Sequence, residues 1–86
     1  MQVRERIRQF VGESFLFGQP VDISDDDSFL ERGIIDSTGV LELITFIEVA
    51  FGIRVQDSDL VPDNLDSIEK LTRYVQRQLR PTNGGG

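Results

Sequence analysis

The sequence predicts an all-α fold: a small antiparallel four-helix bundle with three long helices, one short helix and a long loop between the first two helices. Three observations predict it. Apolar residues recur every three to four positions along three stretches of the chain. No stretch shows the apolar-polar alternation of a strand. A run rich in Pro, Asp, Ser and Gly separates the first two helical stretches.

The first helix is expected over residues 2–16, with Gly18 and Pro20 ending it. Its apolar stripe consists of Val3, Ile7, Phe10, Val11 and Phe15. The long loop then runs from Gln19 to Asp36, and within it we expect a single turn that starts at Ser28 and closes at Gly33. Apolar side chains should hold this loop against the core, namely Val21, Ile23, Phe29, Leu30, Ile34 and Ile35.

The second helix should begin at Asp36 or Ser37 and run to Phe51, with Gly52 as its stop signal. One face of this helix is apolar and is expected to face the core: Val40, Leu43, Ile44, Ile47 and Phe51. The opposite face mixes acidic, hydroxyl and aliphatic side chains, and this composition suits the docking of a partner: Thr38, Leu41, Glu42, Thr45, Glu48 and Val49.

The short helical segment is expected between Gln56 and Val61, capped by Asp57 and closed by Pro62, with Leu60 and Val61 pointing inward. The last helix should start after Asn64, with Asp66 as N-cap and Glu69 completing a capping box. It should end at Pro81, and its apolar stripe consists of Ile68, Leu71, Tyr74, Val75 and Leu79. We expect one domain over residues 1–80 and a disordered tail over 81–86.

The composition excludes several kinds of functional site and of binding partner. The chain has no cysteine and no histidine, which excludes thiolate zinc sites, cysteine nucleophiles and imidazole bases. We therefore expect neither an enzyme nor a metal site. Fifteen acidic and nine basic residues give a net charge of −6, which opposes binding to nucleic acid and to anionic membranes and favours partners with basic patches. The sequence contains no apolar run long enough for a membrane span, so we expect a cytoplasmic protein. We also expect it to be a monomer.

The Asp36-Ser37 pair has two interpretations. Both residues are favoured N-caps, and a cap stabilises a helix by about 0.5–2 kcal/mol. Alternatively, the hydroxyl of Ser37 is displayed at the rim of the bundle, fixed by the apolar pair Ile34 and Ile35. Because the chain has no histidine base to activate a serine, another protein would have to act on Ser37.

This layout resembles the acyl carrier protein family over roughly residues 3 to 79. The matching residues are Phe29 to Ser37 (FLERGIIDS), Val40, Glu42 and Leu43, Ile47 and Glu48, Phe51 to Ile53, Leu60 to Pro62, and Asn64 to Ile68. The resemblance implies that a separate phosphopantetheinyl transferase attaches 4'-phosphopantetheine from coenzyme A to Ser37, with Asp36 helping to position the metal-bound coenzyme A. The arm would then carry an acyl or aminoacyl group as a thioester in fatty acid, polyketide or specialised biosynthesis.

The resemblance also implies a docking face for an acyl or aminoacyl ligase, an acyltransferase or a synthase. Glu42, Glu48 and Asp57 fall where the family places acidic recognition residues, and Leu41 and Val49 would supply apolar contacts. Val49 and Arg54, however, stand where carriers of fatty acid synthesis more often have carboxylates, and Gly39 lies just inside the helix. These departures favour a specialised pathway, and the Asp-Ser-x-Gly stretch is similar to D-alanyl carriers.

The competing interpretation is a non-catalytic acidic helical interaction module with weak calcium binding and no prosthetic group. The run from Asp22 to Asp27 offers four carboxylates, and Asp57 and Asp59 offer two more. Neither group has the glycine and the distal glutamate of a calcium-binding loop. Ser37 distinguishes the two interpretations, because only the carrier requires it.

Overall fold

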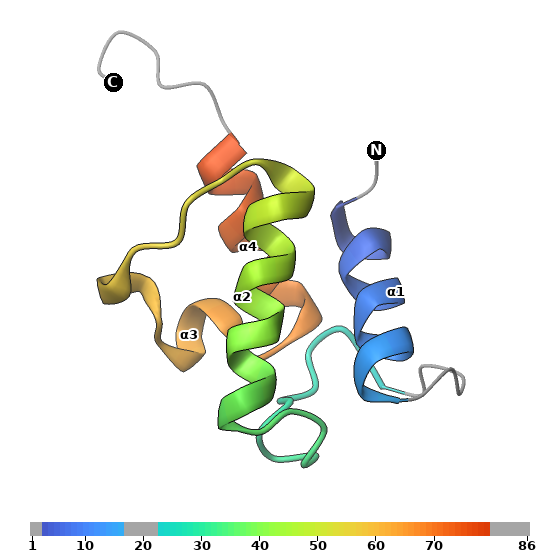
Figure 1. Cartoon of the computed structure of the whole chain (residues 1–86). Helices are drawn as coiled ribbons and strands as arrows, with labels where there is room; N and C mark the ends of the chain where they lie inside the picture. The colour runs from blue at the N-terminus through green and yellow to red at the C-terminus, as the bar shows by residue number, and fades with distance from the viewer. Residues whose placement is uncertain (1–2, 17–22, 80–86) are drawn as a thin grey trace, which may run out of the picture.

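The computed structural model describes residues 3–16 and 23–79, and within these residues it contains helices and no strand. The three long helices are α1 (Val3–Phe15), α2 (Ser37–Phe51) and α4 (Ile68–Leu79). A single 3-10 turn, η1 (Asp57–Asp59), and the short helix α3 (Pro62–Leu65) lie between α2 and α4. The prediction of an all-α bundle with three long helices and one short helix is confirmed (Figure 1). The expected tail over 81–86 lies outside the described residues.

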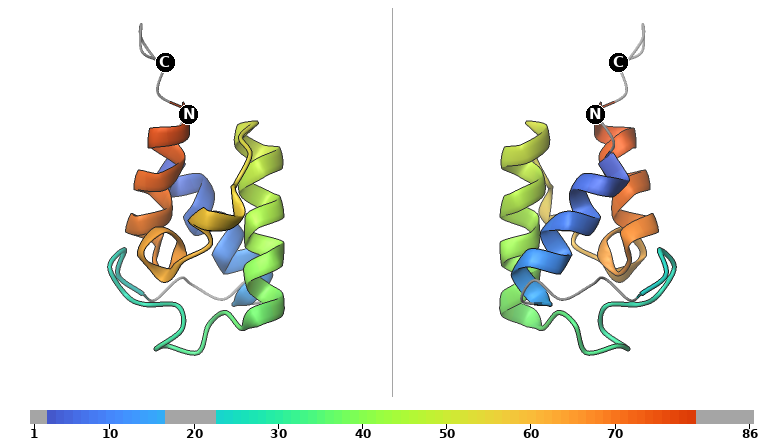
Figure 2. Two further views of the ribbon diagram at one scale, coloured as in Figure 1. Left: turned by 90° about the vertical axis from the view of Figure 1, so that its left-hand side faces the viewer. Right: turned by 90° about the vertical axis from the view of Figure 1, so that its right-hand side faces the viewer.

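The long helices surround one core. In Figure 1, α2 stands in front of α4, with α1 on one side and α3 on the other, and the side views of Figure 2 show the same arrangement. Helix α1 runs opposite to α2 and α4, which share one direction because η1 and α3 carry the chain back along the bundle. The bundle is therefore antiparallel only between α1 and the other two long helices. None of the described helices has the length and apolar character needed to cross a membrane.

The core takes residues from every helix and from the long loop. In α1, Ile7 and Val11 are fully buried, while Val3, Phe10 and Phe15 of the predicted stripe pack at its edge. The predicted core face of α2 is buried at Leu43, Ile47 and Phe51 and partly buried at Val40 and Ile44. In α4 the buried apolar side chains are Ile68, Leu71, Tyr74 and Val75, whereas Leu79 is exposed.

The long loop lies on the core as expected and contains the predicted turn. The Arg32 amide donates to the Ser28 carbonyl at 3.0 Å, and Gly33 closes the turn with a φ of 67°, which favours glycine. Ile23, Phe29 and Ile35 are buried and anchor the loop. The prediction for Leu30 is wrong, since its side chain is 54% exposed. Val21 lies outside the described residues.

The cap of α4 differs from the prediction. The Ser67 hydroxyl, and not the carboxylate of Asp66, accepts from the amide of Lys70, at 3.0 Å. Asp66 instead faces the loop, where its carboxylate accepts from the Ser28 hydroxyl and, at 3.0 Å, from the Leu30 amide. No capping box forms in this part of the structure, because Glu69 pairs with Arg4 at 2.5 Å and with Arg73 at 2.7 Å. Asp66 therefore ties the loop to the junction of α3 and α4.

The segment predicted from Gln56 to Val61 contains η1, and the short α-helix α3 follows it. Pro62 begins α3 and does not close the preceding segment, because a proline suits the first helical position, where its missing N–H has no helical partner. Asp57 is the first residue of η1 and provides no side-chain cap. Leu60 and Val61 were expected to point inward, but each is 41% exposed. They flank an apolar hollow described below.

The acidic run at the start of the loop is paired with arginines. Asp25 contacts Arg4 at 3.0 Å and Arg8 at 2.8 Å, and Asp27 contacts Arg32 at 3.0 Å. The Asp25 pairs join the loop to α1, whereas the pair of Asp27 and Arg32 lies within the loop. Within residues 3–16 and 23–79, no group of three or more acidic side chains is arranged to hold a metal ion. Asp22, the first residue of the run, lies outside the described residues.

Buried Tyr74 makes the stability of the bundle pH-dependent. Its hydroxyl donates to Asp59 at 2.8 Å, and burial followed by this hydrogen bond raises the pKa of Tyr74 to about 12. An unfolded tyrosine has a pKa of about 10. The free energy of unfolding contributed by Tyr74 should therefore be complete below pH 10 and should be lost as the pH rises towards 12. Urea unfolding at pH 8 and at pH 11 measures this loss.

Tyr74→Phe serves as the control for this prediction. The variant should lose about 1 kcal/mol at pH 8, because Asp59 loses its hydrogen-bond donor. Its stability should fall less than that of the wild type between pH 8 and pH 11. An equal fall in both proteins would contradict the assignment to Tyr74.

Candidate functional site

Ser37 is the first residue of α2 and is exposed. Asp36 caps the helix: its side chain accepts from the Gly39 amide at 2.8 Å, and its carbonyl accepts from the Val40 amide at 2.9 Å. Among the described residues, the Ser37 hydroxyl has no hydrogen-bond partner. Both interpretations of the pair thus hold: Asp36 caps the helix, and the adjacent Ser37 exposes its hydroxyl.

The backbone before Ser37 is fixed to the core. Ile35 is only 4% exposed, and Ile34 packs against the edge of the core. At the other end of α2, Gly52 adopts a left-handed conformation with a φ of 67° and its amide donates to the Glu48 carbonyl. Both predicted ends of α2 are confirmed. Ser37 is therefore displayed on a helix whose start is held by apolar anchors and by a cap.

Gly39 allows a close contact below Ser37. A Cβ atom at this position would lie 2.9 Å from Cε1 of Phe15 and 3.0 Å from Cγ2 of Ile35. Both distances are shorter than ordinary carbon contacts. The glycine inside the helix is explained by this packing, because any side chain would push α1 and the loop away from the first turn of α2.

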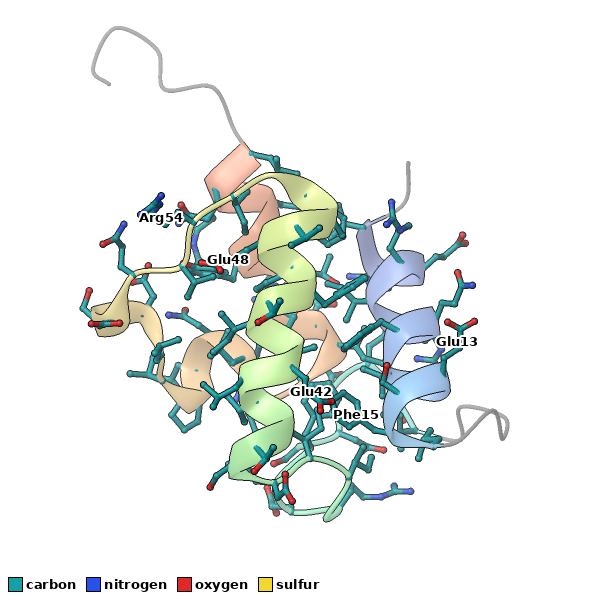
Figure 3. The ribbon with its side chains drawn as sticks, in the orientation of Figure 1. Glu13, Phe15, Glu42, Glu48 and Arg54 are labelled. Carbon is teal, nitrogen blue, oxygen red and sulfur yellow. The ribbon has the colours of Figure 1, made fainter. Side chains whose placement is uncertain are left out.

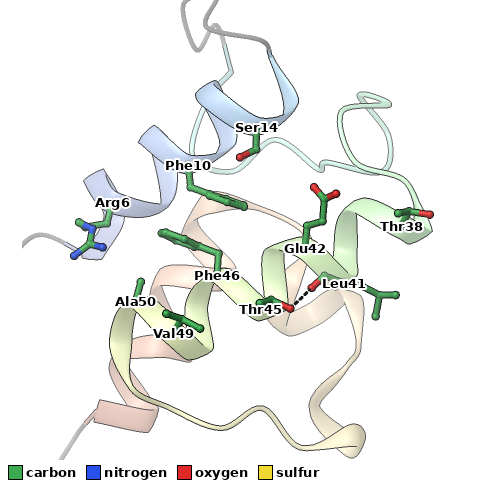
Figure 4. A pocket seen from close by; sticks show the side chains of 10 residues that line it. All are labelled: Arg6, Phe10, Ser14, Thr38, Leu41, Glu42, Thr45, Phe46, Val49 and Ala50. Atoms are coloured by element: carbon green, nitrogen blue, oxygen red, sulfur yellow. Dashed lines mark hydrogen bonds between the residues drawn. The ribbon is translucent and has the colours of Figure 1, made fainter.

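Five of the predicted docking residues line an open groove between α1 and α2. They are Thr38, Leu41, Glu42, Thr45 and Val49, and the groove also contains Phe46 and Ala50 of α2 and Arg6, Phe10 and Ser14 of α1 (Figure 4). Its volume is about 750 Å³. Phe10 stacks on Phe46 with ring centroids 4.1 Å apart, and these rings form an apolar floor. We call this surface the α1–α2 groove.

Glu48 and Asp57 lie on a different surface. The Glu48 carboxylate accepts from the Val55 amide at 2.9 Å, which ties the end of α2 to the following segment. Together with Arg54 and Asp57, it borders a separate polar hollow beside η1. Figure 3 shows Glu42 and Glu48 at separate places along α2, with Glu48 close to Arg54. The predicted docking residues thus border two hollows, the α1–α2 groove and the polar hollow beside η1.

A third hollow is small and apolar. It lies between the long loop, α2 and α3 and has a volume of about 170 Å³. Leu30, Val40, Leu60 and Val61 are among its lining residues. Leu30, Leu60 and Val61, which were predicted to face the core, thus lie exposed around an apolar hollow at the surface.

The geometry of the site suits the attachment of a group to the Ser37 hydroxyl. The sequence has no histidine or cysteine, and the Asp36 carboxylate is engaged with the Gly39 amide. An exposed hydroxyl without a hydrogen-bond partner, on a rigid helix start, is open to modification from outside. A small helical domain that displays a hydroxyl in this way suits the class of proteins that work through an attached prosthetic group.

The comparison with known families agrees with this class. Residues 2–75 match the family described as "Phosphopantetheine attachment site". The chain belongs to this family, the phosphopantetheine-dependent carrier proteins related to acyl carrier proteins, and its cofactor is covalently attached 4'-phosphopantetheine.

Several curated relatives are carrier proteins of streptococci. The chain is 31% identical over 77 residues to the D-alanyl carrier protein of Streptococcus thermophilus, with 87% of this chain and 92% of the relative covered. It has the same identity and coverage with the D-alanyl carrier protein of Streptococcus gordonii. The relative from Streptococcus pyogenes serotype M1 is 31% identical over 61 residues, with 71% and 77% covered. The relatives support a carrier role.

Proposed function

We propose that Ser37 is the attachment point of the phosphopantetheine arm and that the protein delivers acyl or aminoacyl groups without catalysing a reaction itself. The single observation that carries this proposal is the exposed Ser37 hydroxyl at the start of α2, next to the Asp36 cap. In the attachment step, the Ser37 oxygen forms a bond to the phosphorus of the arm. The pyrophosphate bond of coenzyme A breaks, adenosine 3',5'-bisphosphate leaves, and the serine proton passes to the transferase.

The arm supplies a thiol that carries the cargo as a thioester. We propose that this cargo is small, in the manner of an aminoacyl group. The relatives named D-alanyl carrier proteins support this choice. So does the apolar hollow of about 170 Å³, which lies below the roughly 300–1,000 Å³ typical of ligand pockets. A long fatty acyl chain would find little room in it.

The proposed arm and its cargo imply two partner enzymes. A phosphopantetheinyl transferase would install the arm, and an acyl or aminoacyl ligase would load it. We propose that these enzymes dock beside Ser37, on the exposed side chains Leu41, Glu42 and Val49 of α2. Leu41 is 64% exposed and Val49 is 80% exposed, so both are available for apolar contacts.

Mass spectrometry tests the attachment point. Incubation with coenzyme A, Mg²⁺ and a broad-specificity phosphopantetheinyl transferase should add one phosphopantetheine mass to the wild-type protein. Ser37→Ala should gain nothing, because the accepting oxygen is absent. Ser58→Ala removes another exposed serine and should be modified like the wild type. Full modification of the Ser37→Ala protein would contradict the proposal.

A charge reversal tests the docking face. Glu42→Lys should lower the kcat/KM of the transferase by roughly 3–10-fold at low ionic strength, and the loss should shrink with added salt. Glu13→Lys makes the same charge change on α1, where Figure 3 shows Glu13 turned away from α2. It should have a much smaller effect. Glu48 is unsuitable for this test because it binds the Val55 amide. Equal rates for the Glu42 variant and the wild type would show that Glu42 takes no part in docking.

A further inference from the structure

The α1–α2 groove begins beside the proposed attachment point. Thr38, the residue after Ser37, lines one end of it, and Arg6 and Ala50 lie towards the other (Figure 4). Leu41 is four residues beyond Ser37, so the two residues lie one above the other on the same side of α2. Leu41 also lines the groove. A group that leaves Ser37 along α2 therefore meets the groove within one helical turn.

We propose that the phosphopantetheine arm rests in the α1–α2 groove when no partner enzyme is docked. This inference rests on the proposed attachment at Ser37. The part of α2 that lines the groove, from Thr38 to Ala50, is about 18 Å long. The main chain of the arm is about as long as five amino acid residues and reaches about 17 Å when extended. The groove is thus as long as the arm.

The chemistry of the groove matches that of the arm. Beyond its phosphodiester, the arm is uncharged, with a dimethyl branch, a hydroxyl, two amides and a thiol. The stacked rings of Phe10 and Phe46 offer an apolar surface to the methylene groups in the half of the arm that ends in the thiol. The Thr45 hydroxyl donates to the Leu41 carbonyl at 3.0 Å and keeps its lone pairs to accept from an amide. An arm lying in the groove would also cover the exposed side chains of Leu41 and Val49.

Size favours this groove over the apolar hollow beside the loop. The groove, at about 750 Å³, lies within the roughly 300–1,000 Å³ typical of ligand sites, whereas the hollow has only about 170 Å³. The resting arm would lie on the residues proposed to receive a partner enzyme. Docking would then displace the arm and release its thiol towards the enzyme, so the unloaded thiol would be sheltered between encounters.

The test compares NMR spectra of the protein before and after modification by transferase and coenzyme A. Signals near Ser37 should shift in any case. The inference predicts additional shifts far along the groove, at Thr45, Val49 and Ala50, and proton contacts between the methylene groups nearest the thiol and the ring of Phe46. Ser14→Glu places a charge in the groove from its α1 wall, away from Leu41, Glu42 and Val49, and should abolish the remote shifts while modification still occurs. Leu60→Glu, a matched change at an exposed apolar residue beside the small hollow, should leave them intact.

The outcomes separate this inference from the proposed function. Modification of Ser37 with remote shifts along the groove supports both. Modification with shifts confined to residues 36–41, or with remote shifts at Leu30, Leu60 and Val61, overturns the resting site and leaves the carrier function in place. A wild-type protein that gains no arm at Ser37 overturns the proposed function and the resting site with it.

Discussion

Asp66→Ala is expected to lower the free energy of unfolding by about 2 kcal/mol, because the Ser28 hydroxyl and the Leu30 amide lose a charged acceptor. For a domain of this size, the melting temperature should fall by about 10 °C. Since Asp66 ties the long loop to the start of α4, the loop should also open more often. Amide hydrogen exchange at Leu30 should quicken more than exchange within α1, and urea unfolding gives the stability.

Asp63→Ala is the matched control for Asp66→Ala. Asp63 is exposed, lies in α3 and has no hydrogen-bond partner among the described residues. Its replacement should change the stability by less than about 0.5 kcal/mol. If the two variants unfolded at the same urea concentration, the Asp66 contacts would have no part in holding the loop.

Gly39→Val is expected to cost about 2–3 kcal/mol, because the new side chain must displace Phe15 and Ile35 from the first turn of α2. Intrinsic helix propensity alone predicts a small gain of a few tenths of a kcal/mol. The sign of the measured change therefore decides between packing and propensity. Thermal unfolding followed by circular dichroism provides the measurement.

Thr38→Val introduces the same side chain one position earlier, where the residue is exposed. This control should change the stability by less than about 0.5 kcal/mol. A Gly39→Val protein as stable as the wild type would mean that α1 and the loop can move aside at little cost. The explanation of this glycine by close packing would then be wrong.

Helices α1 and α2, which form the walls of the α1–α2 groove, were predictable from local sequence. The apolar stripe of α1 places Ile7 and Val11 in the core, and α2 starts and stops at strong terminators, Asp36 and Gly52. These signals depend on neighbouring residues alone. Ser37 could be singled out for the same reason, since the cap that precedes it fixes where the helix starts.

The region between α2 and α4 was harder to predict, because several residues there are equally good helix caps. Asp57, Asp66 and Ser67 all have short polar side chains, and local sequence cannot rank them. The hydrogen bond from Ser28, 38 residues earlier in the chain, engages Asp66 with the loop and leaves Ser67 as the cap of α4. A contact between residues so far apart in the sequence produces no periodic pattern of residue types, so local sequence does not reveal it.

The groove could be predicted only in part. Helical spacing placed Leu41, Glu42, Thr45 and Val49 on one face of α2, and the structure brings them together. The opposite wall comes from Arg6, Phe10 and Ser14 of α1, and its position depends on how the two helices pack. Phe46 lies four residues after Glu42 and three before Val49, and Ala50 lies four residues after Phe46, so helical spacing could have found them. The hydrogen bond between the Val55 amide and Glu48 joins the helix to a residue beyond its end, so helical spacing could not reveal it.

The central claim is that the oxygen of Ser37 bears the arm. Peptide fragmentation in a mass spectrometer, applied to the protein after treatment with transferase and coenzyme A, tests it most directly. We predict that the phosphopantetheine mass is found on one peptide and is assigned to Ser37. Finding that mass on another serine, or on none, would contradict the account.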